Sequence, residues 1–192
     1  MDRIVRISVA AAVTAMVALS VVGCGLLRPP ERFTDETTVR EDIRTIQLVD
    51  SSGSVTVRGD DNATEVSVER HVSYRGERPV DETHEVDGDT LELHGCGRRC
   101  SVDYTIDVPA GVDVRGATSN GAIKLTEVGE VDVQTSNGRI ELEDIAGSVA
   151  VETSNGRITG SDLNGDGVRV TTSNGAIELG RASCRERVFA VV

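Results

Sequence analysis

Cys24 is the residue whose surroundings most clearly predict chemistry. It follows Gly23 at the end of an apolar stretch, residues 7–22, and that stretch comes directly after the basic residues Arg3 and Arg6. A basic start, a short apolar run and a small residue before a cleavage point are typical of a secretory signal. The apolar run is shorter than the roughly 20 residues that a membrane-spanning helix needs.

The sequence Val-Val-Gly-Cys at positions 21–24 resembles the lipobox of bacterial lipoproteins. In that motif the cysteine thiol receives a diacylglyceryl group and becomes the new N-terminus. The resemblance implies a lipoprotein signal peptide over residues 1–23 and lipidation of Cys24. Because two acyl chains are what stable anchoring requires, we expect an extracytoplasmic protein held to the cell membrane by lipid. An uncleaved anchor, or an ordinary signal with an incidental cysteine, is the alternative.

Cys96 and Cys100 are separated by three residues and lie between strand-like segments at 91–93 and 102–104. If those strands are antiparallel, the short loop brings the two cysteines to disulfide distance. Export favours oxidation, so a disulfide is predicted. A metal site of His94, Cys96 and Cys100 is the alternative, but it lacks a fourth ligand and its spacing is not a standard zinc pattern.

Asp162, Asn164 and Asp166 match the first half of a calcium-binding loop, in which oxygen ligands alternate and a glycine makes the turn. Position twelve of such a loop would be Ser173 instead of glutamate, and no helix is expected beside it. These residues are a weak metal candidate, and a structural connector with inserted residues is the preferred interpretation. No cofactor is predicted.

The composition favours an all-β fold and excludes one class of partner. The net charge is −12, whereas nucleic-acid binding needs a basic face, so no nucleic acid is expected to bind. Aromatic residues make up only 2% of the chain, so the core must come from Val, Ile and Leu. The β-branched members of this set suit the pleated surface of a sheet.

The sequence Thr-Ser-Asn-Gly occurs four times, beginning at Thr118, Thr135, Thr153 and Thr172. Around it, apolar residues alternate with polar ones, which predicts half-buried strands. Each unit supplies two short strands, a connector with one further apolar residue, and two turns. The predicted repeat turns are Asn120-Gly121, Asn137-Gly138, Asn155-Gly156 and Asn174-Gly175.

Two arrangements of these strands remain open. In a β-solenoid, equivalent residues of successive units stack, and the asparagine side chains can form a ladder. In stacked β-hairpins, Asn-Gly makes a type I′ turn, which places Val133 opposite Leu142 and Thr135 opposite Ile140. The near-constant period and the recurring apolar connector residue favour the solenoid.

The other segments differ from the repeat region, residues 111–180. Residues 24–42 have too little apolar content to bury a core, which predicts a flexible tether. Residues 43–110 are strand-like but less regular, and we expect an N-terminal β region that caps the repeats or continues their sheets. Residues 181–192 have no repeat match and contain a lone Cys184. We interpret them as a divergent tail, either an unusual cap or, preferably, a non-native addition.

The segment CSVDYTIDVPAGV at 100–112, with Ser-Asn-Gly repeats after it and a lipobox before it, resembles a bacterial β-strand-repeat family. That family is named "putative adhesin" and is the domain-of-unknown-function class numbered 4097. The resemblance covers residues 43–180. It implies an envelope location and a β-helical fold, and it transfers no functional residues.

We expect a non-catalytic envelope lipoprotein whose repeats offer a binding or scaffold surface, in an adhesion-like role toward a cell-wall polymer or an envelope protein. A sensory or regulatory lipoprotein acting through a membrane-protein partner is an alternative. A polysaccharide-active β-helix enzyme is less favoured because it would need clustered carboxylates. Stacking instead predicts one column of Lys124, Glu141, Thr159 and Glu178, and another of Ala122, Arg139, Arg157 and Ala176.

Overall fold

The computed structural model describes residues 29–80, 82–180 and 188–191. The predicted signal peptide, Cys24 and most of the divergent tail, Cys184 included, lie outside these residues. From Glu31 onward the chain forms one unit of β-strands, and its described residues contain no helix. The prediction of an all-β fold is therefore confirmed. No helix that could cross a membrane occurs within the described part of the chain.

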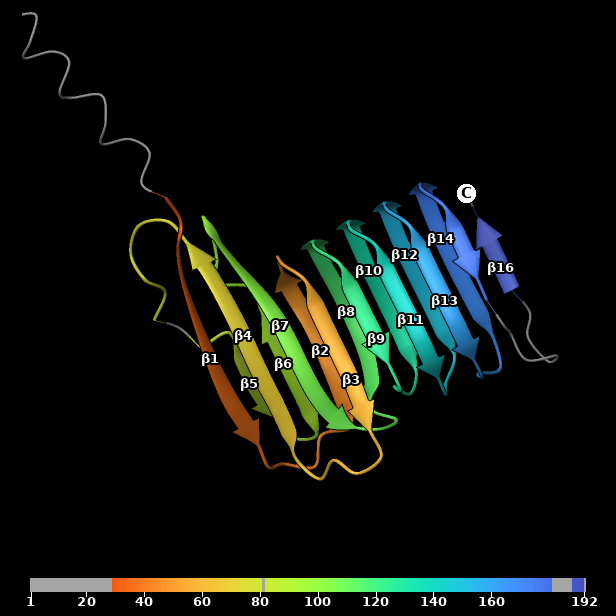
Figure 1. Ribbon diagram of the computed structural model, residues 1–192, viewed down its shortest axis with the longest axis horizontal. Helices are drawn as coiled ribbons and strands as arrows, with labels where there is room; N and C mark the ends of the chain where they lie inside the picture. The colour runs from red at the N-terminus through yellow and green to blue at the C-terminus, as the bar shows by residue number, and fades with distance from the viewer. Residues whose placement is uncertain (1–28, 81, 181–187, 192) are drawn as a thin grey trace, which may run out of the picture. The chain divides into compact units, whose positions relative to one another are not determined.

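The described strands form two eight-stranded sheets (Figure 1). We call them sheet A and sheet B. In spatial order, sheet A contains β1 (Glu31–Val39), β4 (Val66–Tyr74), β7 (Cys100–Pro109), β3 (Val55–Asp60), β9 (Ile123–Thr126), β11 (Ile140–Ile145), β13 (Ile158–Leu163) and β15 (Ile177–Leu179). Sheet B contains β16 (Val188–Val191), β14 (Val168–Asn174), β12 (Val149–Asn155), β10 (Val131–Asn137), β8 (Asp113–Asn120), β2 (Thr45–Ser51), β6 (Thr90–His94) and β5 (His84–Asp87).

Each successive repeat adds one strand to each sheet. β10 pairs in parallel with β8 and β12, so that Val131 lies beside Val114 and Val149. In sheet A, β11 pairs in the same way with β9 and β13. The chain therefore passes from sheet B to sheet A through the Asn-Gly turn and returns through the connector. Equivalent residues of neighbouring repeats stand side by side in every layer.

The stacked-hairpin alternative is wrong. It places Val133 opposite Leu142, whereas Val133 lies between Gly116 and Val151 of the neighbouring repeats. Neither Asn137 nor Gly138 has the positive φ that a type I′ turn requires. The reason is that the Asn-Gly segment carries the chain between two sheets instead of reversing it within one.

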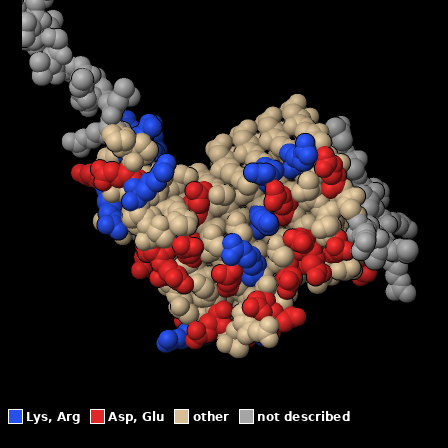
Figure 2. Space-filling model, viewed as in Figure 1, with Lys and Arg blue, Asp and Glu red and all other residues tan. Residues whose placement is uncertain are grey.

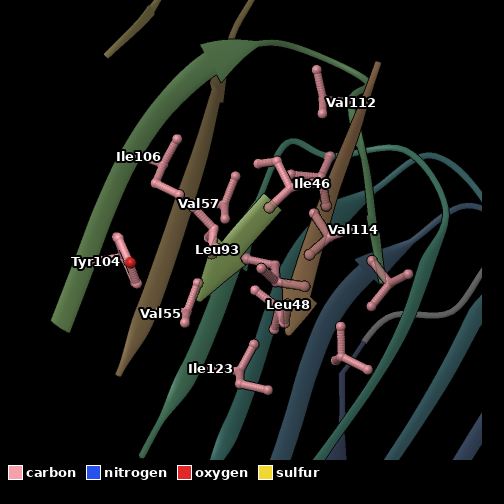
Figure 3. Packing of buried hydrophobic residues seen from close by; sticks show 14 of the residues in the cluster. Ile46, Leu48, Val55, Val57, Leu93, Tyr104, Ile106, Val112, Val114 and Ile123 are labelled. Carbon is pink, nitrogen blue, oxygen red and sulfur yellow. The ribbon is translucent and has the colours of Figure 1, made fainter. Parts of the chain in front are cut away.

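Apolar side chains fill the space between the sheets. Along each strand every second side chain points toward the interior. Val131, Val133 and Ile140 are such residues, and each is at most 1% exposed. The connector residues Val128 and Ile145 are fully buried at the edge of this core. Figure 3 shows how Ile46, Leu48, Val55 and Val57 of β2 and β3 enter the same core.

Residues 43–110 continue the two sheets of the repeats. β2 pairs in parallel with β8, and β3 pairs in parallel with β9, with Val55 beside Ile123. The segment Ser52-Gly53-Ser54 occupies the place of an Asn-Gly turn. Its Gly53 N donates to Asn120 O, as Gly121 N donates to Asn137 O in the repeats. β6 and β7 form a further layer beyond β2 and β3. The antiparallel strands β1, β4 and β5 end the sheets on that side.

The predicted tether is wrong for residues 31–39, which form β1. This strand pairs antiparallel with β4 along its whole length, from Glu31 beside Tyr74 to Val39 beside Val66. The composition predicted a tether because β1 has few apolar residues. Most of the strand is exposed, Phe33 is half-buried, and Val39 is buried. An edge strand gains stability from its backbone hydrogen bonds and from polar contacts, so it does not need an apolar sequence.

Candidate functional site

The predicted repeat turns form a hydrogen-bonded ladder along one edge of the domain. Asn137 Nδ2 donates to Asn120 Oδ1 across 3.1 Å, and Asn155 Nδ2 donates to Asn137 Oδ1 across 3.1 Å. Asn174 extends the ladder with a bond of 3.2 Å to Asn155. Because the amides in the middle of the ladder both donate and accept within it, these side chains join neighbouring repeats.

Buried threonines and close-packed glycines support the same turns. Thr153 Oγ1 donates to Gly138 O across 3.0 Å, one repeat earlier in the chain. Thr135 and Thr172 make equivalent bonds. A Cβ added to Gly138 would lie 1.8 Å from Gly121 O, so only glycine fits between the stacked backbones. The turn residues that the sequence singled out therefore have a structural role.

The connectors form the opposite edge of the repeats, and they are acidic. Glu127, Asp144 and Asp162 occupy equivalent positions with φ of 53°, 54° and 51°. Figure 2 shows that carboxylates gather along this edge, whereas the edge with the Asn-Gly turns is uncharged. The repeats thus present two chemically different edges.

The weak calcium candidate is part of such a connector. Leu163 pairs with Ile145 of the preceding repeat and is buried, as the connector interpretation predicts. Asn164 Nδ2 donates to Asp144 Oδ1 across 3.3 Å and to Asp162 O across 3.2 Å. Among the described residues, no group of three or more His, Cys, Asp or Glu side chains is arranged to hold a metal ion.

Cys96 and Cys100 are joined by a disulfide, with their Cα atoms 5.5 Å apart. The flanking strands are not an antiparallel pair as expected, because β6 lies in sheet B and β7 in sheet A. The disulfide instead closes the loop that passes between the sheets, at the same edge as the Asn-Gly turns. His94 contacts Glu92, with 3.3 Å between Nε2 and Oε2.

The outward face of the repeats in sheet A carries mixed charges. As predicted, Glu141 stands between Lys124 and Thr159 in one column. Glu141 lies 4.0 Å from Lys124 Nζ and 3.4 Å from Arg139, and Arg157 lies 3.1 Å from Glu178. The carboxylates of Glu141 and Glu178 therefore each lie next to a cation.

A shallow pocket of about 500 Å³ lies on the outward face of β1, β4 and β7. Thr34 Oγ1 is 2.7 Å from His71 Nδ1, and His71 Nε2 is 3.6 Å from Glu69 Oε1. A hydroxyl, an imidazole and a carboxylate in this order resemble an acid–base relay. The His71 side chain is 50% exposed, and the distance from Nε2 to the Glu69 carboxylate is longer than a hydrogen bond. The arrangement suits hydrogen bonding to a polar ligand. Its lining residues are Arg32, Phe33, Thr34, His71, Val72, Ser73, Ser101 and Asp103.

Behind this pocket, an ion pair faces the interior. Arg70 binds Asp35 through two nitrogens, one of them across 2.8 Å, and donates to Thr83 Oγ1 across 3.0 Å. The hydrogen bond from Arg70 lowers the pKa of Asp35 and raises that of Arg70. These contacts attach β1 and the segment before β5 to β4.

Two more titratable side chains complete this polar interior. The Tyr104 hydroxyl contacts the carbonyl oxygens of Thr83 and His94, the latter at 2.9 Å. Burial raises the pKa of Tyr104 to about 12, whereas burial and then the charge of Arg70 lower the pKa of His84. The hydrogen bonds of Tyr104 join β7 to the segments that carry Thr83 and His94, which indicates a structural role for this hydroxyl.

Sequence reasoning missed this interior cluster, although a signal was present. Val66, Val68, Val72 and Tyr74 alternate along β4, and position 70, at the inward place in that pattern, is arginine. A cation inside an apolar alternation indicates a buried partner. Asp35 carried no such signal, because its segment was interpreted as a tether.

No family model and no curated protein matches the chain. Two solved structures are similar over most of its length. A "putative cell adhesion protein" from Clostridium sporogenes has 12% identity and a TM-score of 0.39, over 85% of this chain and 98% of the other. A "putative adhesin" from Parabacteroides distasonis has 11% identity and a TM-score of 0.33, over 83% and 94%. Likenesses this distant assign the chain neither a fold nor a function.

Proposed function

We propose that this chain is a non-catalytic lipoprotein of the bacterial cell envelope, anchored through Cys24, and that its repeats form a β-solenoid which serves as a rigid binding or scaffold surface. The observation that carries the proposal is the one-to-one parallel register of equivalent residues from β8 to β14. Such stacking gives an extended surface whose side chains recur at the strand spacing of about 4.8 Å.

The chemistry of that surface supports binding over catalysis. The turn edge presents exposed serines and asparagines, and the carboxylates of the sheet A columns at Glu141 and Glu178 are paired with cations. A regular array of hydroxyl, amide and paired charged groups suits a long polar ligand or a flat protein surface. We propose a cell-wall polymer or an envelope protein as the partner, in an adhesion-like role.

Lipidation is tested directly in a bacterial host. The full chain, with a C-terminal tag, is expressed with labelled palmitate, and a Cys24→Ser variant is expressed alongside it. We expect label in the wild-type protein, which sediments with membranes, and none in the variant. Unlabelled wild-type protein of unprocessed size would overturn the proposed anchor.

Ligand binding is tested with residues 25–192, which contain every described strand. The immobilised protein is exposed separately to purified cell-wall polysaccharide and to detergent-solubilised membrane proteins, with and without calcium. Retention of wall polymer supports the adhesion-like role. Retention of one membrane protein alone would instead support a regulatory lipoprotein. Loss of polymer binding in chelator would show calcium-dependent binding, for which the Asp162 connector is the candidate site.

A further inference from the structure

Five exposed arginines belong to three segments that meet at the corner of sheet A where β1 begins. Figure 2 shows basic side chains at this corner, which lies at the start of β1 in Figure 1. One belongs to β1, two to the loop after β4, and two to the disulfide loop before β7. We call this group the arginine corner. Its members are Arg32, Arg75, Arg78, Arg98 and Arg99.

The three segments that supply these residues are adjacent. Glu31 at the start of β1 lies beside Tyr74 at the end of β4, and Tyr74 lies beside Cys100 at the start of β7. The two loops are joined directly, because Arg75 N donates to Arg99 O across 3.0 Å. The disulfide between Cys96 and Cys100 closes the loop that carries two of the arginines.

The arginine corner is basic although the chain has a net charge of −12. Glu31 and Glu77 lie in the same segments, but the described residues form no ion pair with any of the five arginines. Arg78 lies over the Phe33 ring, 4.1 Å from its centroid, which restrains the side chain. Such a concentration of cations in an acidic protein indicates an anionic partner.

An exposed apolar side chain belongs to the same loop as two of these cations. Val80 is 90% exposed and follows Arg78 by two residues in the same loop. Within residues 29–80 and 82–180, Val80 is the large apolar side chain that is most exposed to solvent. Cations next to an exposed apolar group suit the headgroup region of a bilayer, where charge meets phosphate and the apolar group meets the acyl boundary.

The arginine corner lies close in the sequence to the proposed lipid anchor, so the membrane that holds the anchor is the nearest anionic surface. Glu31 is the seventh residue after Cys24, and seven extended residues span at most about 25 Å. A lipid on Cys24 would therefore keep the start of β1 within about 25 Å of the membrane surface. We propose that the arginine corner binds the anionic phospholipid surface of the membrane to which the chain is anchored, and so fixes which end of the β-repeat stack faces the bilayer. This inference rests on the proposed lipid anchor.

Vesicle binding by residues 25–192 tests the arginine corner without the lipid. The probe is vesicles of phosphatidylglycerol and phosphatidylcholine in equal parts, with pure phosphatidylcholine as the reference. We expect co-sedimentation with the anionic vesicles alone, and release at high salt, because screening shortens the reach of the surface potential. The Arg75→Glu/Arg98→Glu variant should bind at least about tenfold more weakly.

The matched control is Arg115→Glu/Arg169→Glu, which changes the net charge equally on exposed residues of sheet B. It should bind anionic vesicles like the wild type. Equal loss in both variants, or no binding by the wild type, would overturn the proposal. So would binding to a soluble wall phosphodiester polymer in place of vesicles. Palmitate labelling of Cys24 is measured separately, so a failed arginine corner is distinguishable from a failed anchor.

Discussion

Asn137 donates a hydrogen bond of 3.1 Å from its side-chain amide to that of Asn120, 17 positions earlier in the chain. The contact forms because each repeat returns the chain to the same edge, one strand spacing further along. Asn155 makes the same bond to Asn137. The amides therefore connect three successive repeats at a turn that would otherwise be held by its backbone and a buried threonine.

The first prediction concerns this ladder. Asn137→Ala removes one hydrogen bond to Asn120 and one from Asn155, and we expect it to lower the free energy of unfolding by about 1 kcal/mol. Urea unfolding of residues 25–192 measures the change. The neighbouring Ser136→Ala is the control, with an expected effect within about 0.5 kcal/mol. Equal effects of the two substitutions would argue against the ladder.

The glycine at the same turn should be far less tolerant. In Gly138→Ala the new Cβ would lie 1.8 Å from Gly121 O, so the two repeats must separate. We expect a loss of about 3 kcal/mol or more in the free energy of unfolding. Gly167→Ala is the matched control, because a Cβ there has no atom within 4 Å. Its melting temperature should stay close to that of the wild type.

The ion pair of Arg70 and Asp35 should make stability fall in acid. The pKa of Asp35 is lowered in the folded protein, so its contribution is present above the unfolded value of about 3.9 and is lost as pH falls through the folded pKa. Arg70→Met should remove this contribution. Since the Asp35 side chain is 38% exposed, we expect Arg70→Met to lower the free energy of unfolding by about 2 kcal/mol at neutral pH, less than for a fully buried pair.

Unfolding curves at several pH values between about 2 and 7 measure this effect. Asp35→Asn/Arg70→Met, which leaves neither charge inside, should be less destabilised at neutral pH than Arg70→Met alone. If the single variant kept the full acid dependence of the wild type, the ion pair would not be its source.

His84 should contribute a second pH dependence in a different range. Burial lowers its pKa in the folded protein, so the unfolded chain binds the proton more readily. Neutral His84 therefore contributes fully to the free energy of unfolding above the unfolded pKa of about 6.5. This contribution decreases as the pH falls toward the folded pKa. His84→Gln should abolish this part of the pH profile. His71→Gln is the control, since His71 is an exposed side chain on the outward face of β4.

The sequence predicted the repeat region well because its information is local and periodic. Alternation at Val131 and Val133 identified the inward face, and the recurrence of Thr-Ser-Asn-Gly identified the stacking column. The positions of β6 beyond β2 and of β7 beyond β3 could not be predicted in this way, because β6 and β7 follow these strands in the chain but lie outside them in the sheets. β1 was missed because an edge strand with polar inward contacts has the composition of a linker.

The disulfide between Cys96 and Cys100 should stabilise the domain modestly. It closes a loop of five residues, and loop-closure entropy for so short a loop corresponds to about 2 kcal/mol. Cys96→Ser/Cys100→Ser should lower the free energy of unfolding by that amount, and reductant should lower the melting temperature of the wild type but not of the variant. Because Val102 N donates to Ser52 O next to this loop, the sheets should persist without it. A reductant effect of equal size in the variant would show that another group is responsible.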